Sequence, residues 1–163
     1  MKLNLILTIL WFTLNFAFAQ TSEFVPKYIT TLTEESGKSL MNQCSRKSYK
    51  EVNKFWVIDT LNLNNLITHF KEITTQKADN RQKITELSNY GYQLIGIEIN
   101  NKKFIYVNAF GIGEENPDQT RDSLLKNWRF KPISVCDGGD YFWGILFDIE
   151  TNEFSQLSIN GGF

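Results

Sequence analysis

The chain has very few residues of the kinds that bind transition metals or act as nucleophiles. Its 163 residues include 1 histidine, His69, and 2 cysteines, Cys44 and Cys136, which are far apart in the sequence. A zinc site needs a compact set of histidine, cysteine and carboxylate ligands, and this spacing does not supply one. Asp137 and Asp140 lack the denser run of oxygen ligands found in calcium loops. We therefore expect no metal site and no other cofactor.

The sequence also lacks a nucleotide-binding glycine pattern and any large excess of charge. Gly37-Lys38-Ser39 resembles the end of a phosphate-binding loop, but Leu32 stands where that motif requires another glycine. The 17 Lys and Arg residues against 18 Asp and Glu residues give a formal net charge of −1. This charge provides no electrostatic basis for binding nucleic acid, so we expect no nucleic-acid partner.

The beginning of the chain has the composition of a secretory signal peptide. Met1 and Lys2 precede an uncharged run from Leu3 to Phe18, and Ala17-Phe18-Ala19 gives a small-x-small pattern before Gln20. This pattern predicts cleavage after residue 19 and export to the periplasm or the extracellular medium. We expect no stable membrane insertion after cleavage, because no other apolar run approaches the length that spans a bilayer.

In an exported protein, an even number of cysteines favours a disulfide. We therefore predict a bridge between Cys44 and Cys136, which the chain-entropy model makes worth roughly 4–5 kcal/mol for a loop of this length. Two buried free thiols are one alternative. In another, Cys136 is a nucleophile with His69 as its base and Asp137 or Asp140 orienting it. A disulfide would consume that thiol.

Apolar residues at helical spacing predict helices in the first half of the chain. Thr31-Leu32-Thr33-Glu34 fits a capping box in front of a short helix that contains Leu40 and Met41. Asp59 or Thr60 begins the clearest helix, which carries apolar residues at intervals of three and four. These residues are Leu63, Leu66, Ile67, Phe70 and Ile73. Weaker signals predict short helical segments over 81–88 and 117–126.

From Tyr92 onward the apolar period changes to two, which is typical of strands. A strand with Ile95, Ile97 and Ile99 turns at Asn100-Asn101 into a returning strand, as in a hairpin. Further strands are predicted over 133–136, 141–149 and 154–159. The sum predicts a single α+β domain over 20–163. In it, N-terminal helices pack on a mostly antiparallel sheet of about four to six strands.

Scattered short motifs resemble a group of small exported bacterial proteins of uncharacterised function. The resemblance covers most of the chain after the leader, and it implies a secreted single domain. It carries over no catalytic residue. The motifs are Cys44-Ser45-Arg46-Lys47, Phe55-Trp56, residues 104–110, Val135-Cys136-Asp137-Gly138-Gly139, Phe142-Trp143-Gly144 and Asn160-Gly161.

Three adjacent aromatic residues, Tyr141, Phe142 and Trp143, point to alternate faces of the predicted strand. At least one large ring therefore points away from one core face, where either a second helix layer covers it or it forms a recognition surface. Acidic residues precede these rings in the same predicted hairpin. We predict a binding site made of Asp137, Asp140, Tyr141 and Trp143, with an exported or envelope protein as the partner.

The sequence thus predicts a secreted or periplasmic, non-enzymatic binding module, and we assign no catalytic residue. An inhibitor, an immunity-type protein or an envelope accessory protein would fit this description. One alternative is a small secreted hydrolase that uses Cys136 with His69, or a pair among the carboxylates Glu98, Asp148 and Glu150. The other is a small-ligand carrier in which helices and sheet enclose an apolar pocket.

Overall fold

Six strands form one mixed sheet in the computed structural model, which describes residues 23–113, 116–120 and 122–161. The predicted signal peptide lies outside the described residues. The strand order is β1-β3-β4-β5-β6, and β2 also pairs with β3. Only β1 runs parallel to its neighbour among these pairs. The strands are β1 (Ile29–Thr31), β2 (Val52–Trp56), β3 (Tyr90–Ile99), β4 (Lys102–Gly111), β5 (Phe142–Asp148) and β6 (Glu153–Ile159).

Two α-helices complete the α+β fold, α1 (Glu34–Lys38) and α2 (Thr60–His69). The Asp59 side chain caps α2 by accepting a hydrogen bond of 2.8 Å from the Asn62 N–H, as predicted. The predicted cap of the first helix was wrong by two residues. Thr31 pairs with Leu94 in the sheet, so its backbone belongs to β1, and Thr33 caps α1 instead. The helices therefore alternate with β1 and β2 along the chain.

Short 3₁₀ turns follow both helices and precede β3 and β5. They are η1 (Ser39–Met41), η2 (Phe70–Thr75), η3 (Leu87–Asn89) and η4 (Gly139–Tyr141). Of the predicted helical segment over 81–88, only Leu87 and Ser88, which begin η3, are helical. Residues 81–86 are irregular, and the Arg81 N–H donates to the Ala78 carbonyl in the turn before them.

The segment between β4 and β5 contradicts two sequence predictions. The described residues of 117–126 form turns in place of a helix, and 133–136 is irregular in place of a strand. In the first stretch, short polar side chains cap nearby backbone amides. Asn116 accepts from the Asp118 N–H, and Asp122 accepts from the Leu124 N–H. In the second stretch, the Ile133 N–H bonds to a glutamine side chain of β3.

The predicted turn at Asn100-Asn101 is confirmed, whereas the hairpin predicted around 137–140 is not formed, because 133–136 is not a strand. Asn100 and Asn101 join β3 to β4 with φ angles of 52° and 61°, values that asparagine tolerates better than most residues. Asn152 has a φ of 61° in the turn between β5 and β6. These two tight turns fix the register of the four strands that form the centre and one edge of the sheet.

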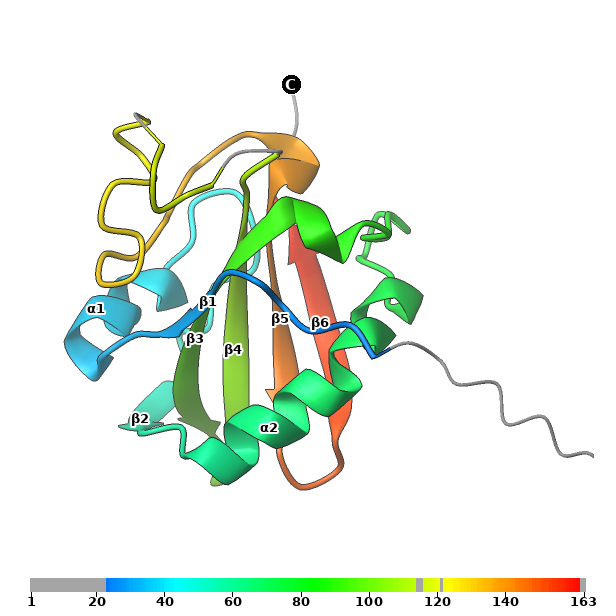
Figure 1. Cartoon of the computed structure of the whole chain (residues 1–163). Coiled ribbons are helices and arrows are strands. Elements are labelled where there is room, and N and C mark those ends of the chain that lie inside the picture. Colours follow the sequence, from blue (N-terminus) through cyan, green and yellow to red (C-terminus); the bar gives the residue numbers. More distant parts are fainter. Residues whose placement is uncertain (1–22, 114–115, 121, 162–163) are drawn as a thin grey trace, which may run out of the picture.

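The two faces of the sheet are covered differently, because alternate side chains of each strand point to opposite sides. On one side, which we call the helical face, Leu66 of α2 and Phe70 and Ile73 of η2 cover the sheet. Figure 1 shows α2 lying across the front of the strands. On the other side, the loop face, α1 lies against Ile95, and mainly irregular segments within 40–49 and 125–136 cover the rest. Both faces are closed by buried side chains.

Candidate functional site

β1 and β2 both pair with the same edge of β3, one after the other. β1 lies beside Tyr92–Leu94, and β2 lies beside Gly96–Ile99. Because β1 is parallel to β3 and β2 is antiparallel to it, the carboxyl ends of β1 and β2 face each other. They meet at Ile95.

At this point the segments that follow β1 and β2 leave the sheet toward its opposite faces. After β1, Leu32 packs on the loop face and leads into α1, whereas after β2, Ile58 packs on the helical face and leads into α2. Diverging connections at neighbouring strand ends leave a crevice, which is also the geometric origin of ligand sites at the switch points of α/β sheets.

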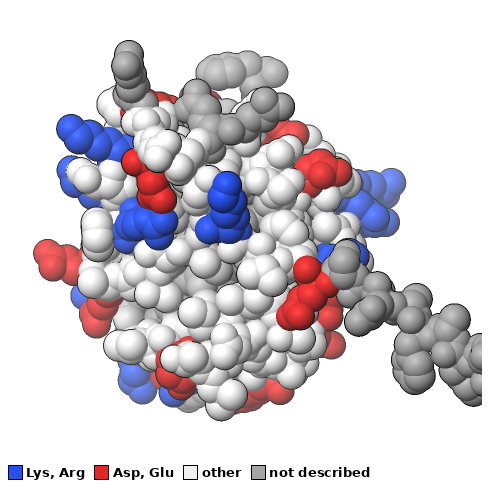
Figure 2. All heavy atoms as spheres, in the orientation of Figure 1, with Lys and Arg blue, Asp and Glu red and all other residues white. Residues whose placement is uncertain are grey.

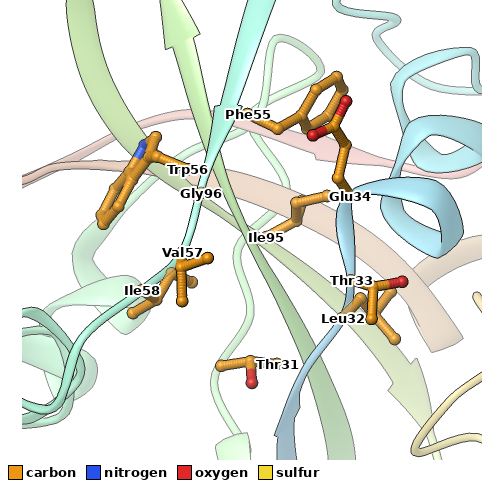
Figure 3. Close-up of a pocket in the computed structure, with 10 residues that line it drawn as sticks. All are labelled: Thr31, Leu32, Thr33, Glu34, Phe55, Trp56, Val57, Ile58, Ile95 and Gly96. Carbon is orange, nitrogen blue, oxygen red and sulfur yellow. The ribbon is translucent and has the colours of Figure 1, made fainter.

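The resulting crevice, which we call the edge cleft, is open to solvent and has a volume of about 330 Å³. Ile95 and Gly96 of β3 lie between its two walls, and most of the lining is apolar (Figure 3). The polar groups come from Thr31, Thr33 and Glu34 at the β1–α1 side. The complete lining is Thr31, Leu32, Thr33, Glu34, Phe55, Trp56, Val57, Ile58, Ile95 and Gly96.

Trp56 forms a fixed wall of the edge cleft. Its Nε1–H donates a hydrogen bond of 3.0 Å to the Ile97 carbonyl, and the Lys103 ammonium lies 5.5 Å from its ring centroid. A Cβ atom on Gly96 would lie 2.7 Å from the Trp56 ring, so the ring position requires glycine at 96. These three contacts fix the position of the Trp56 ring in the absence of a ligand.

Two exposed apolar side chains lie beside the edge cleft, on either side of the exposed Asp59 in the sequence. The Val57 side chain is 91% exposed and Leu61, in the first turn of α2, is 79% exposed. No Lys, Arg, Asp or Glu occurs within α2, and the middle of the face in Figure 2 is largely free of charged residues. Charged pairs flank the cleft, with Glu34 2.8 Å from Lys38 and Lys54 3.2 Å from Glu98. An apolar centre with a polar rim is the usual anatomy of a protein interface.

The four residues predicted to form a binding site do not share one surface. Asp137, Asp140 and Tyr141 are exposed, and Tyr141 is 61% exposed. Trp143 has no exposed surface, because it is the second residue of β5 and points into the core of the helical face. Sequence analysis left open whether a ring of this strand is covered, and the Trp143 ring is buried on the helical face. The binding role of the predicted residues stays a prediction.

The predicted disulfide between Cys44 and Cys136 is present, and it joins segments 92 residues apart. Neither thiol is then available as a nucleophile. His69 also lies on the helical face, where its Nδ1 is 2.8 Å from Glu72 and its ring lies beside Phe147. The cysteines belong to segments that cover the loop face, so the sheet separates His69 from Cys136.

Of the predicted carboxylate pairs, Glu98 with Asp148 is not assembled. Ile97 packs on the loop face, so the next residue, Glu98, points to the helical side. Phe147 packs on the helical face, so Asp148 points to the loop side. Asp148 also accepts hydrogen bonds from the Glu150 and Thr151 amides in the β5–β6 turn. Two carboxylates on opposite sides of a sheet do not flank one glycosidic bond.

Within the part of the chain that the structure describes, no group of three or more His, Cys, Asp or Glu residues is arranged to hold a metal ion. No described helix is long and apolar enough to cross a membrane.

Comparison with known proteins gives no relative. No protein-family model, no curated protein and no solved structure matches this chain. The resemblance to small exported bacterial proteins therefore stays a prediction.

Sequence analysis missed the edge cleft, although one signal for it was visible. Phe55, Trp56, Val57 and Ile58 are four large apolar residues in a row. A strand with one side chain up and the next down cannot bury four such residues unless both of its faces are covered along the whole run. Here β2 ends at Trp56, so Val57 falls just beyond the sheet and stays in solvent.

Proposed function

We propose that this protein is an exported, non-enzymatic binding module that holds a protein partner at the edge cleft. The observation that carries the proposal is the 91% exposure of Val57 beside an open apolar cleft. Leu61 of the adjacent α2 is also exposed, and the other exposed residues of this helix, Thr60, Asn64 and Thr68, are polar but uncharged. Exposed apolar surface of this kind is costly in water and marks interaction sites.

The shape of the patch favours a protein over a small molecule. A volume of about 330 Å³ is at the lower end of the range for small-ligand pockets. Val57 of the lining and Leu61 of the adjacent α2 are both highly exposed, so a molecule that only fills the cleft leaves Leu61 and most of Val57 in water. A partner surface covers the cleft and both projecting side chains together. An enclosed carrier pocket is also disfavoured by the dense packing of large side chains on both faces of the sheet.

Export rests on separate evidence. The predicted signal peptide and the Cys44–Cys136 disulfide both fit a protein that works in an oxidising compartment. An inhibitor, an immunity-type protein and an envelope accessory protein all act there by binding. The proposed function includes these three classes and does not choose among them.

The proposal is tested by placing a photo-crosslinking amino acid at Val57 in the full-length protein in its native host. The same amino acid at Phe130, which is 74% exposed and lies outside the edge cleft, is the matched control. We expect a specific covalent adduct from position 57 and not from position 130. The captured protein is then identified, purified and titrated against the wild-type protein by calorimetry.

Substitutions then locate the interface. Val57→Glu and Leu61→Glu are expected to weaken binding of the purified partner by about tenfold or more each, as for central interface residues. Phe130→Glu is expected to leave the affinity unchanged. Thermal unfolding of each variant checks that the fold is intact. Unchanged affinity in Val57→Glu, or an equal loss in Phe130→Glu, would contradict the proposed site.

A further inference from the structure

A second, smaller hollow lies at the end of the sheet, away from the edge cleft. We call it the tyrosine hollow. It has a volume of about 190 Å³ and is formed where β3 begins, where β4 ends and where η4 leads into β5. Its lining is Asn89, Tyr90, Gly111, Gly113, Asp140 and Tyr141.

The Tyr141 ring is held against the backbone with one side open. A Cβ atom on Gly111 would lie 2.4 Å from Cδ1 of Tyr141, so the ring lies directly on this glycine. Tyr141 is nevertheless 61% exposed. A fixed aromatic ring is therefore accessible to a ligand that enters the hollow.

The second ring of the hollow is fixed more strongly. The Tyr90 hydroxyl donates a hydrogen bond of 2.9 Å to the backbone carbonyl of Asp140, and its ring packs edge-on against Trp143 at 5.4 Å. Burial raises the pKa of Tyr90 above its ordinary value, and the nearby Asp140 adds to this effect. The hydroxyl therefore stays protonated and continues to hold Asp140 at physiological pH.

The charge of the hollow is negative. Asp140 is its only charged lining residue, and the bond from Tyr90 uses the backbone carbonyl of Asp140 and not its carboxylate. The described chain from Asp137 onward contains acidic residues and no Lys or Arg. An anionic ligand would be repelled here, whereas a cation would be attracted both by the carboxylate and by the electron-rich ring faces.

We propose that the tyrosine hollow binds an arginine side chain of a partner protein or peptide. A guanidinium is planar, so it can stack on the open side of Tyr141 while it donates hydrogen bonds to the Asp140 carboxylate. This site is independent of the edge cleft, since the two share no lining residue.

The test uses a small probe, N-acetyl-arginine-N-methylamide, added to the isotope-labelled, disulfide-bonded protein. Amide shifts of Asn89, Gly113 and Asp140 are followed by NMR. The corresponding citrulline derivative, which has the same shape without the charge, is the matched control, and methyl glucoside represents a neutral sugar ligand. We expect saturable shifts with the arginine probe and weaker binding of the other two.

Substitutions separate the contribution of the Asp140 carboxylate to binding from that of the Tyr141 ring. Asp140→Asn and Tyr141→Leu are each expected to weaken binding of the arginine probe about two- to fivefold, the size of a single cation–π or exposed ion-pair contact. Tyr141→Phe keeps the ring and is expected to retain binding. Phe130→Leu, at an exposed aromatic residue elsewhere, is expected to change nothing.

Three results would overturn the proposal. The first is the absence of saturable shifts at the hollow, and the second is equal affinity for the citrulline derivative or for methyl glucoside. The third is unchanged affinity in Asp140→Asn. None of these results bears on the edge cleft, so failure here is distinguishable from failure of the proposed function.

Discussion

The helical face and the loop face of the sheet are buried to the same degree but are held by different interactions. Phe70 on the helical face has no exposed surface and contacts the rings of Tyr92, Phe154 and Phe24, at centroid distances of 4.8, 6.3 and 6.0 Å. This face depends on apolar and aromatic packing. A helix satisfies its own backbone groups, so it can be placed on a sheet by side-chain packing alone.

The loop face needs polar side chains in its interior. Gln93 and Asn108, with 0% and 1% exposure, point from β3 and β4 into the covering segment. Gln93 donates to the Trp128 and Lys131 carbonyls and accepts from the Ile133 N–H. Asn108 donates to Gln93 and to the Ile133 carbonyl. Irregular backbone satisfies only part of its hydrogen bonds internally, so the strands supply further partners from their side chains.

A disulfide and a charged side chain also hold the segments that cover the loop face. The Cys44–Cys136 disulfide joins its two covering segments to each other, and Arg46 donates to the Asn108 side-chain carbonyl. Much of a sheet face can therefore be closed by irregular segments beside one short helix, when hydrogen bonds from the strands and a covalent link hold these segments.

Among the changes that affect one face of the sheet more than the other, removal of the disulfide is expected to lower stability most. Cys44→Ala combined with Cys136→Ala is expected to lower the free energy of unfolding by about 4–5 kcal/mol, because the unfolded chain regains the freedom of a long loop. Denaturant unfolding measures the change. Reduced wild-type protein should match the double variant. Hydrogen exchange should rise first at the Ile133 amide on the loop face, and an equal rise in α2 would contradict the comparison.

Truncating a ring on the helical face tests packing alone. Phe70→Ala is expected to cost about 3–5 kcal/mol, since it removes a fully buried aromatic side chain and leaves a cavity. Phe130→Ala, at an exposed ring, should change stability by less than about 0.5 kcal/mol. Denaturant unfolding measures both. A cost for Phe70→Ala no larger than that of Phe130→Ala would show that packing does not hold this face.

Breaking the polar network is expected to have an intermediate effect. Gln93→Leu keeps the volume but leaves buried backbone groups of the covering segment without partners, at a cost of about 1–3 kcal/mol. Gln119→Leu, at an exposed position, is the control and should be close to neutral. If Gln93→Leu were neutral or stabilising, apolar contacts and the disulfide would be sufficient to hold the loop face.

Alkaline pH is expected to give the smallest difference between the faces. Burial raises the pKa of Tyr92 on the helical face, and burial also raises the pKa of Tyr106 on the loop face, where Arg46 partly offsets it. The unfolded state loses these protons near pH ~10 while the folded state keeps them. Their stabilisation is therefore present below pH ~10 and is lost as the pH rises further.

The two tyrosines can be compared by substitution. Tyr92→Phe is expected to flatten the alkaline loss of stability more than Tyr106→Phe does, because no cation offsets the burial of Tyr92. Urea unfolding measured from neutral pH to about pH 12 checks this expectation. A larger flattening in Tyr106→Phe would contradict the assigned role of Arg46.

The elements that the sequence predicted correctly are those whose structure depends on residues close by in the chain. Asp59 as a helix cap and Asn100-Asn101 as a turn act through their own backbone neighbourhoods, so they were predictable. The strand expected at 133–136 was not formed, because the Ile133 amide bonds to Gln93, which is 40 residues away in the sequence. The edge cleft was missed for a similar reason. It depends on where β1 and β2 end on β3, which is a property of pairing and not of either segment.

The sequence by itself determined the α+β class, the leader motif, the helix at 60–69 and the pairing of the two cysteines, because composition and short-range periodicity specify them. Only the tertiary structure decided that Trp143 is buried while Val57 and Tyr141 are exposed. It also placed His69 and Cys136 on opposite sides of the sheet. The exposure of a side chain depends on what covers its face, and here that cover comes from segments distant in the sequence.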